Sequence, residues 1–218
     1  MPRSVRVYRW AVLVLAAIFF VDRFGTERFT LESFGWQFRY LTIWALTLSL
    51  VSAAMMTTRA YGASDDRGAI FVSVTAAVNL LVVASYWRLA LTDPSLVYGD
   101  TRVVQVRDLY LHLVGPALQV GDALFFKRAI RFARRTVAWV LALIVTYVLW
   151  AELVVAPLND DPVGRVRTGL PYPFLNDLGL GARLRFYAAT ALAGACLVGA
   201  LRLVQAGVPT PRDHGPVR

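Results

Sequence analysis

A threonine hydroxyl and a histidine ring are the two side chains of this sequence that could perform chemistry together. Thr42 lies four residues after Phe38, near the start of one apolar run, and His112 lies four residues after Asp108, near the start of another. If both runs are helices that begin at the same membrane surface, a rise of about 1.5 Å per residue places both side chains about 6 Å below it. A hydroxyl within reach of an imidazole can act as a nucleophile, because the ring nitrogen accepts its proton.

The elements that must position these residues are long apolar segments. The chain of 218 residues is 57% hydrophobic and 17% charged, with a mean hydropathy of +0.54, which is too apolar for a soluble domain. A helix of about 20 apolar residues crosses the hydrocarbon layer of a membrane. Six segments meet this description: Val5–Val21, Phe38–Met56, Ala69–Leu91, Leu109–Phe126, Thr136–Ala156 and Phe186–Val208. We therefore predict an all-α polytopic membrane protein, in which residues 1–208 form one bundle of six transmembrane helices and residues 209–218 form a disordered tail.

The basic residues predict which ends of these helices face the cytoplasm. The chain has 22 Arg and one Lys and a net charge of +9. A cytoplasmic N-terminus places 13 of the basic residues inside and 10 outside, and the densest cluster, from Lys127 to Arg135, then lies in a short inner loop. We predict that both termini are cytoplasmic and that the longest connection, Pro157–Arg185, folds over the outer surface. The preference for Arg over Lys indicates a bacterial cell membrane.

Other partners and cofactors are not indicated by the composition. The arginines lie between apolar runs rather than in a basic stripe interleaved with aromatic residues, so we expect no nucleic-acid partner. Cys196 is the single cysteine, and His112 is the single histidine within the apolar runs. This supply of ligands predicts no metal site, no haem and no other cofactor. The pattern leaves the oligomeric state undetermined.

Polar side chains within the apolar runs are costly in hydrocarbon and mark candidate functional positions. Helical spacing places Thr42 on a face of small residues, and it places Asp108 and His112 on one face of another helix. Asp108 is suited either to orient the ring of His112 or to cap the start of the helix. Three further residues carry donors that could stabilise an oxyanion: Asn79, Tyr147 and Trp150.

A structural role is the alternative for the reactive pair. A membrane threonine often donates its hydroxyl to the carbonyl one turn back, which for Thr42 is the carbonyl of Phe38. A membrane histidine can simply link two helices by a hydrogen bond.

Several short motifs resemble one known family. They are "FGWQFRYLTIWALTL" at 34–48, "LHLVGP" at 111–116, "YVLW" at 147–150, "YPFLN" at 172–176 and "GARLRF" at 181–186. In their order and spacing they resemble the androgen-induced-gene family of six-span membrane proteins, most closely its bacterial branch. The family often has Asn where this chain has Ala45.

The resemblance implies a function and two catalytic residues. Eukaryotic members of the family are threonine hydrolases that cleave fatty acid esters of hydroxy fatty acids. The threonine of the family's "YLT-x-W" motif corresponds to Thr42, and the histidine of its fourth span corresponds to His112. The implied partners are the bilayer and a lipid ester substrate.

A non-catalytic function is the competing hypothesis. Asp108, Gln119 and Asp122 lie along one helix face and would line a polar track in a binding or transport protein. Under the predicted topology Asp122 lies toward the inner surface, where we expect it to pair with Lys127 or Arg128. A scaffold subunit of another membrane protein is a third possibility.

Overall fold

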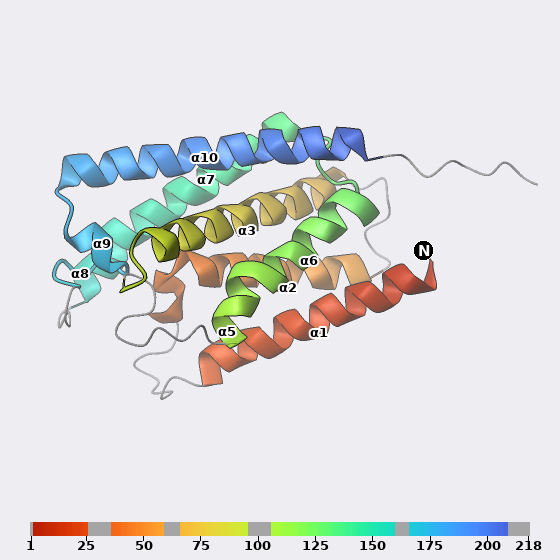
Figure 1. Cartoon of the computed structure of the whole chain (residues 1–218), viewed down its shortest axis with the longest axis horizontal. Coiled ribbons are helices and arrows are strands. Elements are labelled where there is room, and N and C mark those ends of the chain that lie inside the picture. Colours follow the sequence, from red (N-terminus) through yellow and green to blue (C-terminus); the bar gives the residue numbers. More distant parts are fainter. Residues whose placement is uncertain (1, 26–35, 59–65, 96–105, 160–165, 209–218) are drawn as a thin grey trace, which may run out of the picture.

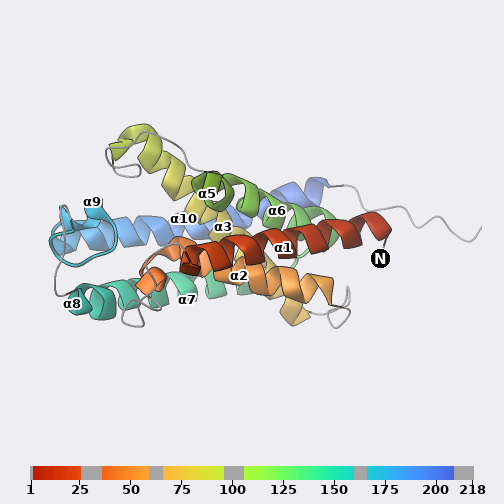
Figure 2. The same cartoon turned by 90° about the horizontal axis from the view of Figure 1, so that it is seen from below.

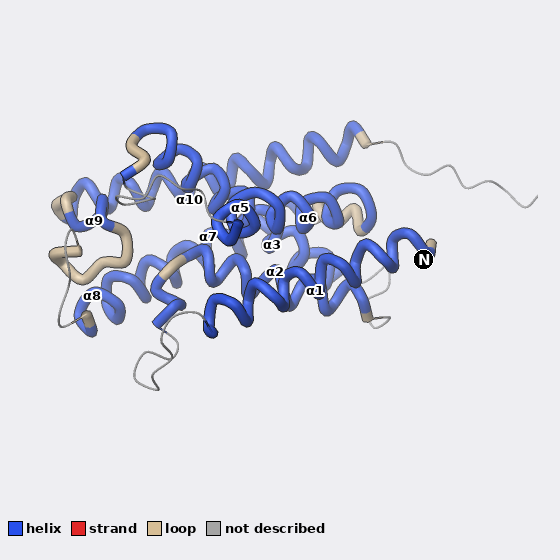
Figure 3. The backbone as a smooth tube through the Cα atoms, turned by 60° about the horizontal axis from the view of Figure 1, so that its bottom comes forward, coloured by secondary structure: helices blue, strands red, loops and turns tan. Residues whose placement is uncertain are grey.

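The regular elements of the described chain are helices. The computed structural model describes residues 2–25, 36–58, 66–95, 106–159 and 166–208, and none of these ranges contains a strand (Figure 3). This confirms the predicted all-α class. The predicted tail at 209–218 lies outside the described residues.

The described residues form six helical passes, and three of these are simple α-helices that follow the predicted apolar runs closely. These are α1 (Arg3–Gly25), α3 (Asp66–Thr92) and α10 (Leu180–Gly207), while α2 (Leu41–Thr57) is shorter. The fourth pass is a chain of four segments: α5 (Val106–Leu109), η3 (Tyr110–Val114), α6 (Gly115–Gly121) and η4 (Asp122–Phe126). The fifth consists of α7 (Ala133–Trp150), η5 (Ala151–Val155) and α8 (Ala156–Leu158). Two short elements complete the set: η2 (Trp36–Arg39) and α9 (Pro173–Asn176).

The passes run alternately to and fro along the long axis of the molecule. Consequently the first turn of α1 and the last turn of α10 lie at the same end of the bundle (Figure 1). Five of the passes are long and apolar enough to cross a membrane. The other, α2, has 17 residues, at the lower limit for a spanning helix. The protein is therefore an integral membrane protein by its helices, and the count of six spans and the cytoplasmic termini stay predictions.

Helix α3 is the centre of the bundle. It packs against α2, α6, α7 and α10, whereas α1 lies outside, along α2 and α6 (Figures 1 and 2). Small side chains such as Ala76 and Ala77 are fully buried on α3 and allow the neighbouring helices to approach closely. Gly194 serves the same purpose on α10, because a Cβ there would lie 3.1 Å from side-chain atoms of both Val140 and Ile144.

Wide π-helical turns interrupt the fourth and fifth passes. The segments η3, η4 and η5 are each five residues long, and a proline stands shortly after two of them, at Pro116 and Pro157. In η3 the amide of Gly115 donates to the carbonyl of Tyr110, five residues back. Such turns change which side chains face the interior, and they occur often at functional sites.

Buried polar side chains join the helices through hydrogen bonds. Asn79 on α3 donates to the hydroxyl of Ser49 on α2 at 2.9 Å, and Gln119 on α6 donates to the Ser49 carbonyl at 3.0 Å. Near the C-terminal end of α10, the side-chain oxygen of Gln205 accepts a hydrogen bond from the amide of Ile130 at 2.9 Å. These contacts satisfy groups that hydrocarbon would leave without partners.

An ion pair attaches α1 to the fourth pass. Nε of Arg9 lies 2.8 Å from Oδ1 of Asp122, and both side chains are largely buried. The sequence-based expectation named Lys127 or Arg128 as the partner of Asp122; the hydrogen-bonded partner is Arg9, and Lys127 adds an electrostatic attraction. Arg128, in a left-handed conformation at φ 51°, directs its guanidinium to carbonyl oxygens at the end of α10. The hydrogen-bonded partner of Asp122 is thus distant in sequence, because the carboxylate reaches Arg9 on α1.

We expect Asp122→Ala to destabilise the protein by about 3–5 kcal/mol, because it leaves a buried guanidinium without its carboxylate. The matched control is Asp66→Ala, which breaks the more exposed ion pair with Arg131 and should cost about 1 kcal/mol or less. Unfolding of each purified variant in detergent measures the difference. Equal losses of stability in the two variants would contradict the structural role of the Arg9–Asp122 pair.

Candidate functional site

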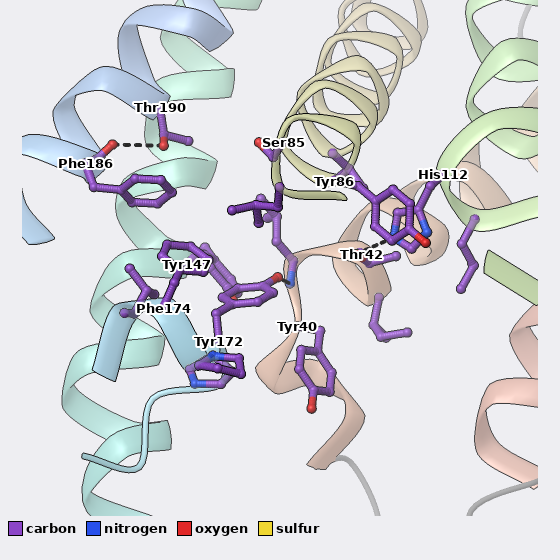
Figure 4. Close-up of a pocket in the computed structure, with 18 of the residues that line it drawn as sticks. Tyr40, Thr42, Ser85, Tyr86, His112, Tyr147, Tyr172, Phe174, Phe186 and Thr190 are labelled. Atoms are coloured by element: carbon purple, nitrogen blue, oxygen red, sulfur yellow. Dashed lines mark hydrogen bonds between the residues drawn. The ribbon is translucent and has the colours of Figure 1, made fainter. Parts of the chain in front are cut away.

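A largely apolar cavity of about 580 Å³ lies at the end of the bundle where α2 and α5 begin. Its walls come from α2, α3, η3, α7 and α10, and the segment before α10 closes one side (Figure 4). This volume is typical of pockets that bind small molecules. The polar residues that line it include Thr42, Ser85, Asp108 and His112.

Thr42 and His112 meet in this cavity. Oγ1 of Thr42 lies 3.4 Å from Nε2 of His112, and the two side chains come from different helical passes. The structure thus brings together the pair that the equal-depth argument selected, because each residue lies in the first turns of a pass that begins at the same end of the bundle. A separation slightly above 3.2 Å is common for a nucleophile and its base when no substrate is bound.

A backbone contact fixes the tautomer of His112. Nδ1 of the ring lies 3.1 Å from the carbonyl oxygen of Asp108, one turn earlier. A carbonyl oxygen can only accept a hydrogen bond, so Nδ1 carries the proton in the neutral ring. Nε2 then presents its lone pair to the hydroxyl of Thr42, which is the arrangement that a general base requires. The contact with the ring is therefore made by the main-chain oxygen of Asp108, which lies in the first turn of α5.

Two consecutive residues of α3 hold His112 in place. The ring of Tyr86 stacks flat on the imidazole, with ring centroids 3.6 Å apart and planes inclined by 8°. The indole of Trp87 donates to the carbonyl of His112 at 2.9 Å. That carbonyl needs a donor from elsewhere, because Pro116, four residues on, has no N–H to offer it. Three contacts therefore hold His112: Tyr86 stacks on its ring, Trp87 donates to its carbonyl, and its Nδ1 is bonded to the Asp108 carbonyl.

The start of α2 is anchored independently of Thr42. The carbonyl of Phe38 accepts hydrogen bonds from the indoles of Trp44 at 2.8 Å and Trp150 at 3.1 Å. These two donors occupy the carbonyl that the structural alternative assigned to the hydroxyl of Thr42. By contrast Thr47, one turn further along α2, does donate to a carbonyl one turn back, at 2.7 Å from Ile43.

Residues 166–178 form a cap on the cavity. Asn176 organises the cap: its amide donates to the carbonyls of Leu170 and Tyr172, and its side-chain oxygen accepts from both the amide and the hydroxyl of Thr168. Gly169 adopts a left-handed φ of 79°, and a Cβ there would lie 2.3 Å from the carbonyl oxygen of Ala156. This part of the long connection folds over the end of the bundle.

The cap is joined to the first turn of α2 by one tyrosine. The hydroxyl of Tyr172 accepts a hydrogen bond from the amide of Leu41 at 3.0 Å, next to Thr42. Burial raises the pKa of the Tyr172 phenol, so the group stays protonated around neutral pH. Tyr172 thus satisfies a free amide at the helix start and connects the cap to the reactive end of α2.

The other residues that the sequence suggested occupy different positions. Tyr147 lines the cavity, but its hydroxyl donates to the carbonyl of Arg39 at 2.8 Å. Asn79 and Trp150 are bonded to groups outside the cavity, and among the described residues neither contributes to its lining. The positions of Asn79 and Trp150 therefore give no support to the predicted role of these two residues in stabilising an oxyanion.

Sequence reasoning missed the residues that position His112 and close the cavity. Tyr86 carried no signal beyond its place near the end of an apolar run. Trp87 carried only the general tendency of tryptophan to lie near a membrane surface. Tyr172 and Asn176 lie in "YPFLN", a motif that carried the resemblance but pointed to no contact. Within the described ranges, no group of three or more His, Cys, Asp and Glu side chains could hold a metal ion.

The fold and the cavity define a class: a helical integral membrane protein with an apolar, capped site near one end of its bundle. The family model described as FAR-17a/AIG1-like protein matches residues 5–206, which is nearly the whole chain. The chain belongs to this family, which confirms the resemblance to the family as a whole; the resemblance to its bacterial branch stays a prediction. No curated protein and no solved structure matches the chain.

We expect Asn176→Ala to loosen the cap, because four hydrogen bonds to this side chain are lost. Local opening of residues 166–178 should become easier by about 2 kcal/mol, that is, roughly 30-fold faster hydrogen exchange of their amides. Asn159→Ala is the matched control, since Asn159 makes one longer contact to the same segment, 3.3 Å from the carbonyl of Gly169. Unchanged exchange in the Asn176 variant would show that the cap is held by other contacts.

Proposed function

We propose that this protein is a membrane-embedded ester hydrolase that uses Thr42 as its nucleophile and His112 as its general base. The observation that carries the proposal is the contact between Oγ1 and Nε2 in a ring whose other nitrogen is committed to a backbone carbonyl. The activity that the resemblance implied, cleavage of fatty acid esters of hydroxy fatty acids, involves the same two residue positions.

The reaction would proceed in two acyl-transfer steps. Nε2 of His112 takes the proton of Thr42 as Oγ1 forms a bond to the ester carbonyl carbon. When the tetrahedral intermediate collapses, the bond to the alcohol oxygen breaks and Nε2–H returns the proton to that oxygen. Water then attacks the acyl-threonine with the same assistance, which releases the fatty acid and restores Thr42. The Asp108 carbonyl stabilises the imidazolium that forms in each step.

The surroundings of the pair favour a lipid substrate. The cavity lies among membrane-spanning helices and is lined mainly by apolar side chains, so an acyl chain loses contact with water when it enters. We place the protein in a bacterial cell membrane, with residues 1–208 as a six-span domain and both termini in the cytoplasm. The shared location of the first turn of α1 and the last turn of α10 supports an even number of crossings.

The polar-track alternative receives less support from the contacts. Gln119 donates to α2 and Asp122 is paired with Arg9, so both of these side chains join helices. In the described chain neither lines the cavity that Asp108 and His112 share. The geometry therefore favours a site at one end of the bundle over a path along it.

We expect Thr42→Ala and His112→Ala each to lower ester hydrolysis at least 100-fold, since each removes one half of the nucleophile–base pair. Thr42→Ser should retain measurable activity, because it keeps a hydroxyl. Purified protein in detergent is assayed with p-nitrophenyl esters and with a fatty acid ester of a hydroxy fatty acid. A fluorophosphonate probe should label the wild type and leave Thr42→Ala unlabelled.

The matched control is Thr47→Ala, on the same helix, whose hydroxyl is bonded to its own backbone. It should hydrolyse esters at close to the wild-type rate. If folded Thr42→Ala protein hydrolyses esters as fast as Thr47→Ala, the assignment of the nucleophile fails. Under a transport or scaffold function, folded Thr42→Ala protein should instead behave like the wild type.

A further inference from the structure

The cavity extends well beyond the reactive pair. Thr42, Tyr86 and His112 lie at one side of it, whereas Phe174, Phe186 and Thr190 lie at the opposite side, against α7 and α10 (Figure 4). We call this second region the α10 arm and define it by six lining residues: Ile144, Tyr147, Val148, Phe174, Phe186 and Thr190. The function proposed above leaves the arm without an occupant.

The hydroxyl groups around the arm are bonded to the protein. Thr190 donates to the carbonyl of Phe186 at 2.9 Å, and Tyr147 donates to the carbonyl of Arg39 at 2.8 Å. Tyr187, beside the arm, donates to the carboxylate of Glu152 at 2.7 Å. The arm therefore offers carbon surface to a ligand rather than hydrogen-bonding groups. Such a surface recognises an unbranched alkyl chain and penalises a polar one.

Aromatic rings define the far side of the arm. Phe174 of the cap and Phe186 of α10 meet nearly edge to face, with ring centroids 5.1 Å apart. The guanidinium of Arg88 lies 5.7 Å from the centroid of Phe186, which further fixes this ring. The rings join the cap to α10, so the length of the arm is set by packing and not by a mobile side chain.

We propose that the α10 arm binds the acyl chain of the ester and that Phe174, Phe186 and Thr190 set the longest chain accepted. The proposal rests on the proposed hydrolase function, because it places the ester carbonyl at Thr42. A chain that begins at this carbonyl then extends between α3, α7 and the cap toward α10. Each methylene buried in the arm raises kcat/KM up to about fourfold, until the arm is full.

The test fills the arm from α10. In Thr190→Trp the indole should occupy the space of the distal methylenes and lower the ratio of p-nitrophenyl palmitate to p-nitrophenyl acetate hydrolysis at least tenfold. The matched control is Leu192→Trp, two residues along the same helix, whose side chain is 66% exposed. It places the same indole on the lipid-facing surface and should leave the ratio at the wild-type value.

A second variant changes the arm in the opposite direction. Phe186→Ala lengthens the space at the far side, so the preferred p-nitrophenyl ester should become longer than in the wild type. If Thr190→Trp and Phe186→Ala both retain the wild-type profile of rate against chain length, the acyl chain does not lie in this arm and the proposal is overturned. A Thr190→Trp variant that lowers acetate and palmitate hydrolysis equally would overturn it as well.

A binding measurement separates this proposal from the proposed hydrolase function. Palmitate should bind to the wild-type protein, and Thr190→Trp should weaken its binding at least tenfold relative to Leu192→Trp. Loss of binding in a protein that hydrolyses no ester would support the arm and reject the hydrolase. Ester hydrolysis with palmitate binding unchanged by Thr190→Trp would support the hydrolase and reject the arm.

Discussion

The contact between Nδ1 of His112 and the carbonyl oxygen of Asp108 is the interaction on which the site depends. A neutral imidazole has one donor and one acceptor nitrogen, and the partner of one decides the role of the other. Because the Asp108 oxygen can only accept, Nε2 is left as the acceptor that faces Thr42. The charge of Asp108 is not required for this, so the orientation is supplied by the helix backbone itself.

The surrounding structure protects that orientation. Pro116 has no N–H that could donate to the carbonyl of His112, and the indole of Trp87 on α3 donates to this carbonyl instead. Tyr86 covers a face of the ring. Near the start of α2, the indoles of Trp44 and of Trp150 on α7 both donate to the carbonyl of Phe38, which would otherwise compete for the hydroxyl of Thr42. The result is a hydroxyl–imidazole pair in which most alternative hydrogen-bonding partners are already occupied.

The membrane environment accounts for the hydrogen bonds and ion pairs that the other buried polar side chains make. In hydrocarbon a polar group without a partner costs several kcal/mol, and several buried polar side chains of this chain have partners on other segments. Ser73 donates to the carbonyl of Ala129, Gln119 donates to α2, and Arg9 pairs with Asp122. These contacts fix the order in which helices lie side by side. By contrast, the Thr42–His112 pair lines the largely apolar cavity that residues 166–178 cap.

The amino-acid sequence determined the helical class, the apolar runs and the common depth of Thr42 and His112, because hydropathy and the rise of a helix depend on local sequence alone. It also carried the family motifs. Only the tertiary structure decided that Asp122 pairs with Arg9, that Tyr86 and Trp87 hold the histidine and that Tyr172 of the cap meets Leu41 at the start of α2. Each of these joins residues far apart in the chain, and such contacts depend on which helices become neighbours and on how the wide turns rotate their faces. Periodicity within one helix contains neither piece of information.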